Sequence, residues 1–311
     1  MKIIKNTISI LLIIAIFGFL IFNDQITDYI NANYIKIKSD DIYLEKNEYA
    51  KEENYKFVKI TNDFNASNFQ ELLNIFYTAL DSGTNEFTFY CDKKYEKCLD
   101  DINKIIPSDK QNDIMAELNN FVHPYNAYKN ITLITNDIGK ITIKFDKLYT
   151  PEMITEINTY IDNFINENIT DEVSDYDKIL KFHDYIINNT SYDIERANDI
   201  NSDLYNDSPS HTAYGVIKNN IALCGGYSDI MAIYLNKLNI QNMKVAADLH
   251  VWNLVYFDSK WLNLDVTWDD PVTNTGLELL IHEYFLIDKT KLFELDSVEH
   301  IFKEEIYLEA K

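Results

Sequence analysis

The alternation of side chains over residues 250–268 constrains the fold of this chain more than any other feature. The stretch HVWNLVYFDSKWLNLDVTW alternates on both sides of Asp258–Ser259, which predicts two antiparallel strands joined by a two-residue turn. In that register His250 and Asp265 lie on one face as diagonal neighbours, roughly 7–8 Å apart. A three-residue turn would separate them, so the pairing depends on the length of the turn.

The other face of this hairpin is continuously apolar. It carries Val251, Val255, Phe257, Leu262, Leu264 and Val266. We expect this face to pack on a neighbouring helix, while the opposite face presents the histidine and the aspartate. Over residues 151–311 helical patterns come first and strands follow, an order that predicts an α+β domain.

The stretch NNIALCGGYSDIMAIYLNKL, residues 219–238, adds a thiol at a special position. Apolar side chains recur at helical spacing after Cys224, which places the thiol in the first turn of a helix. Unpaired N–H groups and the helix dipole favour a thiolate there. Gly225 and Gly226 are expected to let a substrate backbone approach closely. The alternative interpretation is a small residue packed at a helix start.

A nucleophilic cysteine needs a base to take its proton and a third group to orient that base. Of the six histidines, the hairpin geometry favours His250 as the base, with Asp265 as the orienting carboxylate. The competing interpretation is a structural histidine and acid on an aromatic-rich hairpin. Asp269 and Asp270 are rivals for the third role, although WDDP is more typical of a capped turn.

These residues also carry a family pattern. ALCGGYSDIMAIYLNKLNI and HVWNLVYFDSKWLNLDVTWDDP resemble the transglutaminase-like superfamily of bacterial surface proteins. Its members have Cys-Gly-x-Tyr or a close variant at a helix start, His-x-Trp-Asn on a strand and Asp-x-Thr-Trp-Asp-x-Pro on the next. KILKFHDYIINNTSYD, HTAYGVI and the later YFLID, which is similar to a strand of the family, extend the match over roughly residues 175–290.

The resemblance implies a papain-like (transglutaminase-like) thiol-enzyme domain with a catalytic triad of Cys224, His250 and Asp265. The backbone N–H of Cys224 is the expected first oxyanion donor, and either Tyr192 or Tyr214 is a candidate for the second. Neither tyrosine is favoured over the other, and core or rim positions suit both.

Three functions are compatible with this site. The first is transfer of an acyl group from a peptide or protein amide to an amine, and the second is hydrolysis of the same bond with water as the acceptor. The third is a binding module that kept the fold and lost activity, which the intact triad argues against. We expect Trp252 to stand beside the triad and exclude water.

The N-terminus predicts a membrane anchor. Residues 6–23 are uncharged and follow two lysines, near the lower length limit for spanning a bilayer. No small-residue cleavage site follows, so a signal anchor over residues 1–23 is favoured over a signal peptide. The charge asymmetry places the rest of the chain outside the cytoplasm. We expect a single-pass cell-membrane protein, secreted if cleaved, that acts on peptide or protein substrates of the cell surface or cell wall.

Three further segments follow the anchor. Residues 24–53 have the composition of a polar stalk, residues 54–150 form a small α/β module of unknown role, and residues 151–311 form the catalytic domain. In the module we expect a strand over residues 55–61 and a hairpin over 130–145. The module is expected to be a spacer or a substrate-docking domain without a catalytic residue.

Charge and cysteine content exclude other classes of protein. A net charge of -22 argues against nucleic-acid partners, because phosphate neutralisation needs clustered lysine and arginine. Three cysteines are too few for a disulfide scaffold, and Cys91 and Cys98 are compatible with either a local disulfide or two free thiols. We expect no cofactor and no metal, since histidine pairs at i, i+4 are absent.

Overall fold

The computed structural model describes residues 42–107, 113–136, 139–199, 208–272 and 279–311, with a few single positions between 23 and 33. Over these ranges the chain is a mixed α/β structure. Apart from its last residue, the expected anchor lies outside them. Among the helices described, none is long and apolar enough to cross a membrane.

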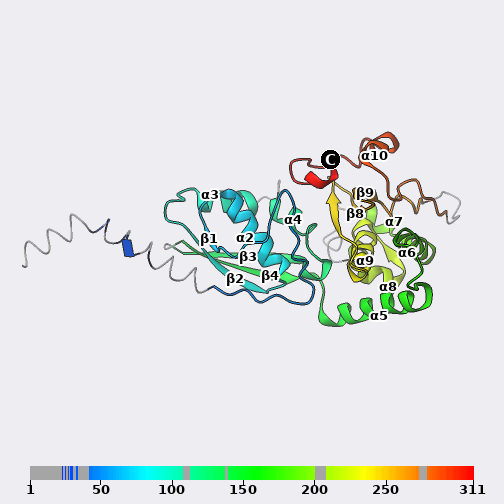
Figure 1. The fold of residues 1–311 in the computed structure, drawn as a ribbon, viewed down its shortest axis with the longest axis horizontal. Coiled ribbons are helices and arrows are strands. Elements are labelled where there is room, and N and C mark those ends of the chain that lie inside the picture. The colour runs from blue at the N-terminus through cyan, green and yellow to red at the C-terminus, as the bar shows by residue number, and fades with distance from the viewer. Residues whose placement is uncertain are drawn as a thin grey trace, which may run out of the picture.

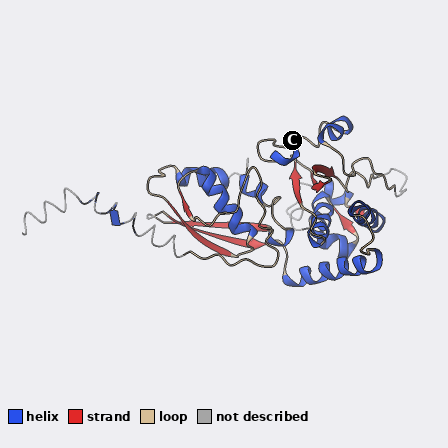
Figure 2. Cartoon of the chain, viewed as in Figure 1, coloured by secondary structure: helices blue, strands red, loops and turns tan. Residues whose placement is uncertain are grey.

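The first part of the chain folds into a four-stranded sheet in the order β1-β2-β4-β3. Strand β1 runs parallel to β2, and the remaining pairs are antiparallel, so β3 and β4 form the expected hairpin. Helices gather on one side of this sheet (Figure 1 and Figure 2). The elements are β1 (Asn65–Ala66), α2 (Phe69–Asp81), β2 (Glu86–Cys91), α3 (Cys98–Ile105), α4 (Ile114–Leu118), η1 (Pro124–Asn126), β3 (Tyr128–Thr135) and β4 (Lys140–Lys147).

Helix α2 is the main helical cover of this sheet. It begins where the side chain of Asn68 accepts the backbone N–H of Glu71, which satisfies one of the first-turn donors. Its buried face includes Leu72, Ile75 and Phe76, which share one core with the inward side chains of β2 and β4.

The expected strand over residues 55–61 is wrong. The backbone N–H of Tyr55 donates to the carbonyl of Val58 at 2.9 Å, so the chain turns instead of extending. Both side chains are buried, which explains the apolar alternation without a strand. The first strand begins only at Asn65.

Cys91 and Cys98 are joined by a disulfide in this structure. The bond links the end of β2 to the first residue of α3, seven residues apart. Disulfides of this kind persist in oxidising compartments. Cys224 is left as the free cysteine.

The second part of the chain begins with two long helices and ends in a three-stranded antiparallel sheet, β7-β8-β9. Helix α5 starts at Pro151 behind the Thr150 cap, and it runs along the lower edge of the domain in Figure 1. The elements are α5 (Pro151–Asn168), α6 (Asp175–Asn189), β5 (Ser191–Tyr192), α7 (Ile194–Ala197), η2 (Pro209–His211), α8 (Ala213–Asn219), β6 (Ile221–Ala222), α9 (Cys224–Lys237), β7 (Asn242–Ala246), β8 (Val251–Phe257), β9 (Lys260–Leu264), α10 (Lys289–Leu295) and η3 (Leu308–Ala310).

The β8–β9 hairpin has the predicted register. Phe257 pairs with Lys260, and the pairing continues to Asn253 opposite Leu264. The turn residues Asp258 and Ser259 have φ values of 48° and 63°, the left-handed pair that a two-residue turn of this kind requires. One face of the hairpin packs on α9, with Val255, Leu264 and Val266 in the same core as the helix. YFLID is not a strand; it makes a single bridge from Ile287 to Asn263.

The two parts of the chain share a core. Met243, Trp252 and Tyr307 belong to the same buried cluster as the sheet β1-β2-β4-β3. Residues 42–53, which have the composition of a stalk, lie along both parts, since the backbone N–H of Lys51 donates to Asp81 and its ammonium reaches the carbonyl of Asn242. The first module is therefore packed directly against the sheet that carries His250.

Candidate active site

Cys224 is the first residue of α9 and its thiol is half-buried. The preceding residue, Leu223, caps the helix without a side-chain hydrogen bond. The backbone N–H of Leu223 donates to the carbonyl of Ser210 at 2.8 Å, so the chain just before α9 is hydrogen-bonded to η2. The thiol therefore stands at the positive end of a 14-residue helix whose first-turn N–H groups are not satisfied by a capping side chain.

The two glycines after Cys224 make room for the protein's own backbone. A Cβ at Gly225 would lie 2.6 Å from the carbonyl oxygen of His211, and a Cβ at Gly226 would lie 2.6 Å from that of Ser210. Close packing of η2 on the first turn of α9 thus requires glycine at both positions. The role in substrate approach stays a prediction, and this packing of the glycines fixes where the thiol lies.

His250 lies directly before β8, buried at 8% exposure, and its Nε2 is 2.5 Å from Oδ2 of Asp265. Since Nε2 is engaged by the carboxylate, Nδ1 is the nitrogen left for Cys224, whose thiol also favours the charged form of the ring. Burial alone lowers the pKa of His250, but the charge and hydrogen bond of Asp265, followed by those of Cys224, outweigh it and raise the pKa to about 10. The imidazole therefore holds a proton at neutral pH.

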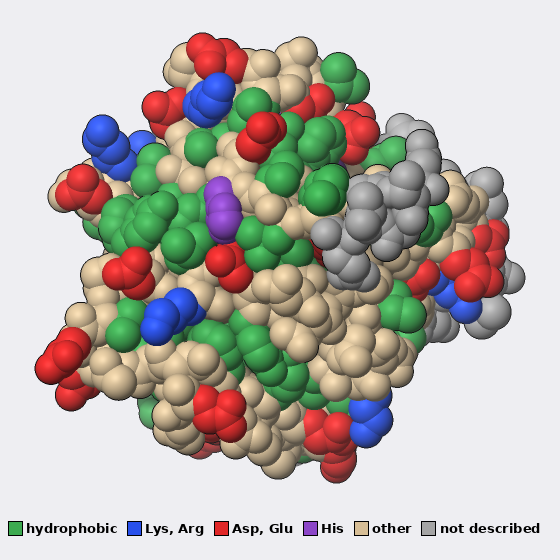
Figure 3. Space-filling model, turned by 90° about the vertical axis from the view of Figure 1, so that its right-hand side faces the viewer, with side chains coloured by type: hydrophobic (Ala, Val, Ile, Leu, Met, Phe, Trp, Pro, Cys, Tyr) green, Lys and Arg blue, Asp and Glu red, His purple; other side chains and the backbone are tan. Residues whose placement is uncertain are grey.

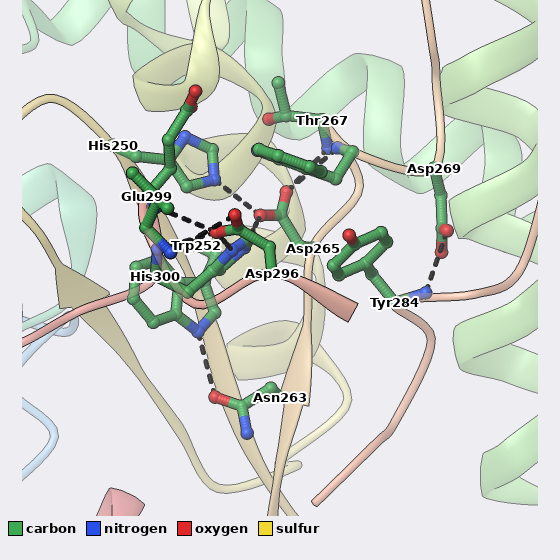
Figure 4. Close-up of polar contacts among 12 residues, drawn as sticks. His250, Trp252, Asn263, Asp265, Thr267, Asp269, Tyr284, Asp296, Glu299 and His300 are labelled. Atoms are coloured by element: carbon green, nitrogen blue, oxygen red, sulfur yellow. Dashed lines mark hydrogen bonds and ion pairs between the residues drawn. The ribbon is translucent and has the colours of Figure 1, made fainter. Parts of the chain in front are cut away.

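Asp265 follows β9 and is almost fully buried. Its Oδ1 accepts the backbone N–H groups of Thr267 and Trp268 at 3.0 and 3.1 Å, while Oδ2 faces His250. Burial by itself raises the pKa of this carboxyl, but the two histidines beside it, His250 and His300, reverse the effect and hold the pKa well below its usual range. The carboxylate is thus charged and fixed in orientation (Figure 4).

The structure brings Cys224, His250 and Asp265 together: the thiol interacts with the imidazole, and the imidazole is hydrogen-bonded to the carboxylate. The family model described as the transglutaminase-like superfamily matches residues 163–266, a range that includes all three. Residues 163–266 form a transglutaminase-like domain. Proteins of this superfamily are usually enzymes related to cysteine proteases.

Two solved structures resemble part of the chain. One, titled as a TGase, is 22% identical with a TM-score of 0.33 and covers 47% of this chain and 45% of its own. The other, a candidate cysteine protease from Cytophaga hutchinsonii, is 12% identical with a TM-score of 0.27 and covers 49% of this chain and 65% of its own. The chain thus spans less than two thirds of either protein. A search of curated proteins finds no match.

Beyond residues 163–266 the structure adds one residue to the site that the sequence did not reveal. His300, fully buried, places its Nε2 3.0 Å from Oδ2 of Asp265, on the carboxylate oxygen that also faces His250. Figure 4 shows both imidazoles directed at this carboxylate, with Asp296 next to His300. His300 follows α10 in a segment without periodic pattern, so no local signal pointed to it.

Trp252 lies beside these histidines, as expected. Its ring stacks on His250 with centroids 5.7 Å apart, and it meets His300 edge-on at 4.9 Å. Its indole N–H donates to Oδ1 of Asn263 at 2.9 Å, so the buried ring is fixed in place. Aromatic surface therefore covers one side of the Asp265–His250 pair and keeps water from it.

Asp269 and Asp270, the alternatives to Asp265, make hydrogen bonds outside the triad. Asp269 is fully buried and accepts from Nε2 of His183 at 3.1 Å and from the backbone N–H of Tyr284 at 2.9 Å. Asp270 accepts the hydroxyl of Tyr227 at 2.5 Å. The expectation that they only cap a turn is wrong, because each joins the turn to a buried residue of a helix.

The two tyrosines considered as oxyanion donors differ in position. The hydroxyl of Tyr214 donates to Glu156 of α5 at 3.2 Å on the surface, so it is not available to a group bound at Cys224. Tyr192 lies on β5, paired with Ala222 two residues before the thiol. Of the two, Tyr192 is the one near the first turn of α9.

Two groups of side chains offer three nitrogen or oxygen ligand atoms within 4.8 Å of one another in the described residues. One is His250, Asp265 and His300; the other is His183, Asp184 and His282. In both groups the atoms are hydrogen-bonded to each other, at 2.5 and 3.0 Å in the first and 2.9 and 2.8 Å in the second. These bonds account for the closeness, and we assign no metal site to either group.

A cleft of about 720 Å³ opens beside His250. Its walls are the segments 246–250 and 298–303 together with Asp113, Ala116 and Glu117 at α4, so the first module contributes one side. Three large apolar side chains at or near its rim are mostly exposed: Leu249, Val298 and Ile301. On the face of the molecule drawn in Figure 3, acidic side chains are spread out and apolar ones gather in patches.

The C-terminal segment contacts the first module next to the cleft. Lys303 pairs with Glu117 at 2.9 Å, and the hydroxyl of Tyr307 donates to the same carboxylate. The ring of Tyr307 stacks on Phe121 with centroids 5.6 Å apart. The first module therefore contacts the C-terminal segment directly at the edge of the cleft.

Proposed function

We propose that this protein is an extracytoplasmic thiol enzyme with a papain-like catalytic domain, which transfers acyl groups from peptide or protein amides through Cys224, His250 and Asp265. The observation that carries the proposal is a thiol beside a protonated imidazole that is hydrogen-bonded to a buried carboxylate. A nucleophile, its base and an orienting group in that order are what acyl transfer through a thioester needs.

The roles follow from the geometry. The Cys224 thiolate attacks the acyl carbon, and the imidazolium of His250 gives its proton to the leaving amine. In the second half-reaction the neutral imidazole takes a proton from the acceptor as it attacks the thioester. Asp265 stabilises the imidazolium and keeps its Nε2–H directed away from the thiol. The Cys224 backbone N–H supplies one oxyanion donor, and Tyr192 is the side-chain candidate for another.

The cleft favours an amine as the acceptor. The carboxylates of Asp248 and Glu299 are exposed on its lining, next to His250. They would attract a primary ammonium, whereas hydrolysis needs no such charge. The apolar residues Leu249, Val298 and Ile301 would hold side chains of the acyl donor.

A pH profile of thiol alkylation tests the ion pair. Because the pKa of His250 is raised to about 10, its positive charge persists through neutral and mildly acidic pH. At pH 6 Cys224 should therefore react with iodoacetamide faster in the wild-type protein than in His250→Ala, which lacks the imidazolium beside the thiol. In His250→Ala the rate should fall about tenfold for each pH unit below 8.5, as for an ordinary thiol. Identical profiles in the two proteins would remove His250 from the site.

The location outside the cytoplasm is proposed from the N-terminal pattern, and the Cys91–Cys98 disulfide is in keeping with it. A protease added to intact cells should digest nearly the whole protein and leave a short N-terminal stub. Complete protection, with digestion only after lysis, would place the domain in the cytoplasm and remove surface substrates from consideration.

A further inference from the structure

The carboxylate of Asp265 has a second histidine partner that the triad does not use. His300 places Nε2 3.0 Å from Oδ2 of Asp265 and Nδ1 2.8 Å from Oδ2 of Asp296. Its side chain has no exposed surface, and the backbone N–H of the same residue also donates to Asp296. The two histidine rings on Asp265 lie 5.2 Å apart, nearly perpendicular to each other.

Hydrogen bonding determines the charge of this buried ring. An ionised carboxylate only accepts hydrogen bonds, so each nitrogen that faces one must carry a proton. Burial raises the pKa of Asp296, but hydrogen bonds from the His300 ring and from backbone N–H groups outweigh it and lower the pKa below its usual value. With Asp265 and Asp296 both ionised, His300 is an imidazolium held between two carboxylates.

The other groups around His300 are aromatic. Tyr284 stacks on the ring at 5.4 Å, and Trp252 and Trp268 meet it edge-on at 4.9 and 5.0 Å. The titratable groups that face the ring are thus Asp265, Asp296, His250 and the hydroxyl of Tyr284. Aromatic faces suit a buried cation, and the low local polarity makes its charge effective over short distances.

We propose that His300 is a positioning residue of the active site, an imidazolium that fixes Oδ2 of Asp265 and weakens the hold of this carboxylate on the His250 proton. The inference rests on the proposed function, in which His250 must both keep and release that proton. A carboxylate shared by two imidazolium ions stabilises each of them less than it would one alone. The positive charge of His300, whose ring centroid lies 5.2 Å from that of His250, also disfavours the protonated form of His250.

The consequence is that the pKa of His250 lies closer to the working pH than it would without His300. Without a counterbalancing cation, His250 would bind its proton too tightly to pass it readily to a leaving amine, because general acids work best with a pKa near the working pH. His300 therefore adjusts the pKa of His250 downward while keeping Asp265 ionised and oriented. In this respect the C-terminal segment 296–303 is part of the active site, although it lies outside the family match.

An NMR titration in the Cys224→Ala background tests this without any need for activity. In His300→Gln the side-chain amide still donates to Asp265 but the charge is gone, so the pKa of His250 should rise by about one unit. His282→Gln is the matched control, since His282 is 43% exposed and bonded to Asp184.

Nitrogen chemical shifts should show both ring nitrogens of His300 protonated at pH 7. With the thiol restored, His300→Gln should lower kcat about tenfold at neutral pH with little change in KM. A neutral His300, or a His250 pKa unchanged in folded His300→Gln, would overturn the inference. If the NMR results are as expected but Cys224 forms no acyl-enzyme, the proposed function is contradicted. The positive charge of His300 is then still supported.

Discussion

Replacement of Cys224 by serine is expected to reduce acyl transfer by at least about a millionfold, comparable to the removal of the nucleophile in other triads. The hydroxyl is a far weaker nucleophile at neutral pH, and the site supplies only an imidazolium, which cannot accept its proton. Turnover of a glutamine-containing peptide with an amine acceptor would be the measurement.

Cys224→Ala should be equally inactive, whereas Cys91→Ser with Cys98→Ser should keep turnover at the assay temperature. That double variant removes the disulfide at the far end of the first module. Normal turnover in Cys224→Ser would rule out the thiol mechanism.

Asp265→Asn is expected to lower kcat by about ten-thousandfold. An asparagine amide at this position presents N–H groups to two histidines, so the hydrogen bond that fixes the His250 ring is lost and its cation is no longer stabilised. Circular dichroism should report a folded protein, because Thr267 and Trp268 can still donate to the side-chain oxygen.

Asp258→Asn is the matched control for this substitution. Asp258 lies in the hairpin turn with a φ of 48°, which asparagine also tolerates, at the end of the strands remote from the site. It should retain wild-type kcat. Asp269 and Asp270 are unsuitable as controls, since both are bonded to buried residues. An Asp265→Asn enzyme with normal turnover would show that another carboxylate orients His250.

The hairpin was predictable because its determinants are local. Alternation from residue 250 to residue 268 and two residues that accept positive φ fix both the register and the face of each side chain. The start of α9 at Cys224 was likewise predictable from helical spacing. Together these local rules place a thiol, an imidazole and a carboxylate on facing elements.

What the sequence did not predict depends on contacts between distant segments. His300 meets Asp265 across 35 residues, and no pattern in LDSVEH marks it. Residues 55–61 alternate in apolarity like a strand, yet the buried side chains Tyr55 and Val58 lie on a turn. The glycines after Cys224 resemble a substrate-facing feature, but the carbonyls of Ser210 and His211 occupy that space.

Local sequence patterns could not predict how the first module packs either. Its residues carry no catalytic motif, so composition alone is compatible with a spacer. Packing of Phe121 on Tyr307 and pairing of Glu117 with Lys303 depend on how the C-terminal segment returns to α4. Only this return brings α4 to the edge of the cleft beside His250.

Trapping of the covalent intermediate is the most direct test of the thiol mechanism. The full-length protein would be mixed with a library of acyl-donor peptides, quenched in acid and digested, and the peptide that contains Cys224 examined by mass spectrometry with and without primary amines. The account predicts a thioester on Cys224 that disappears when amine is added, with the matching amide product formed. An acyl group on any other residue, or product formation while Cys224 is blocked by iodoacetamide, would contradict it.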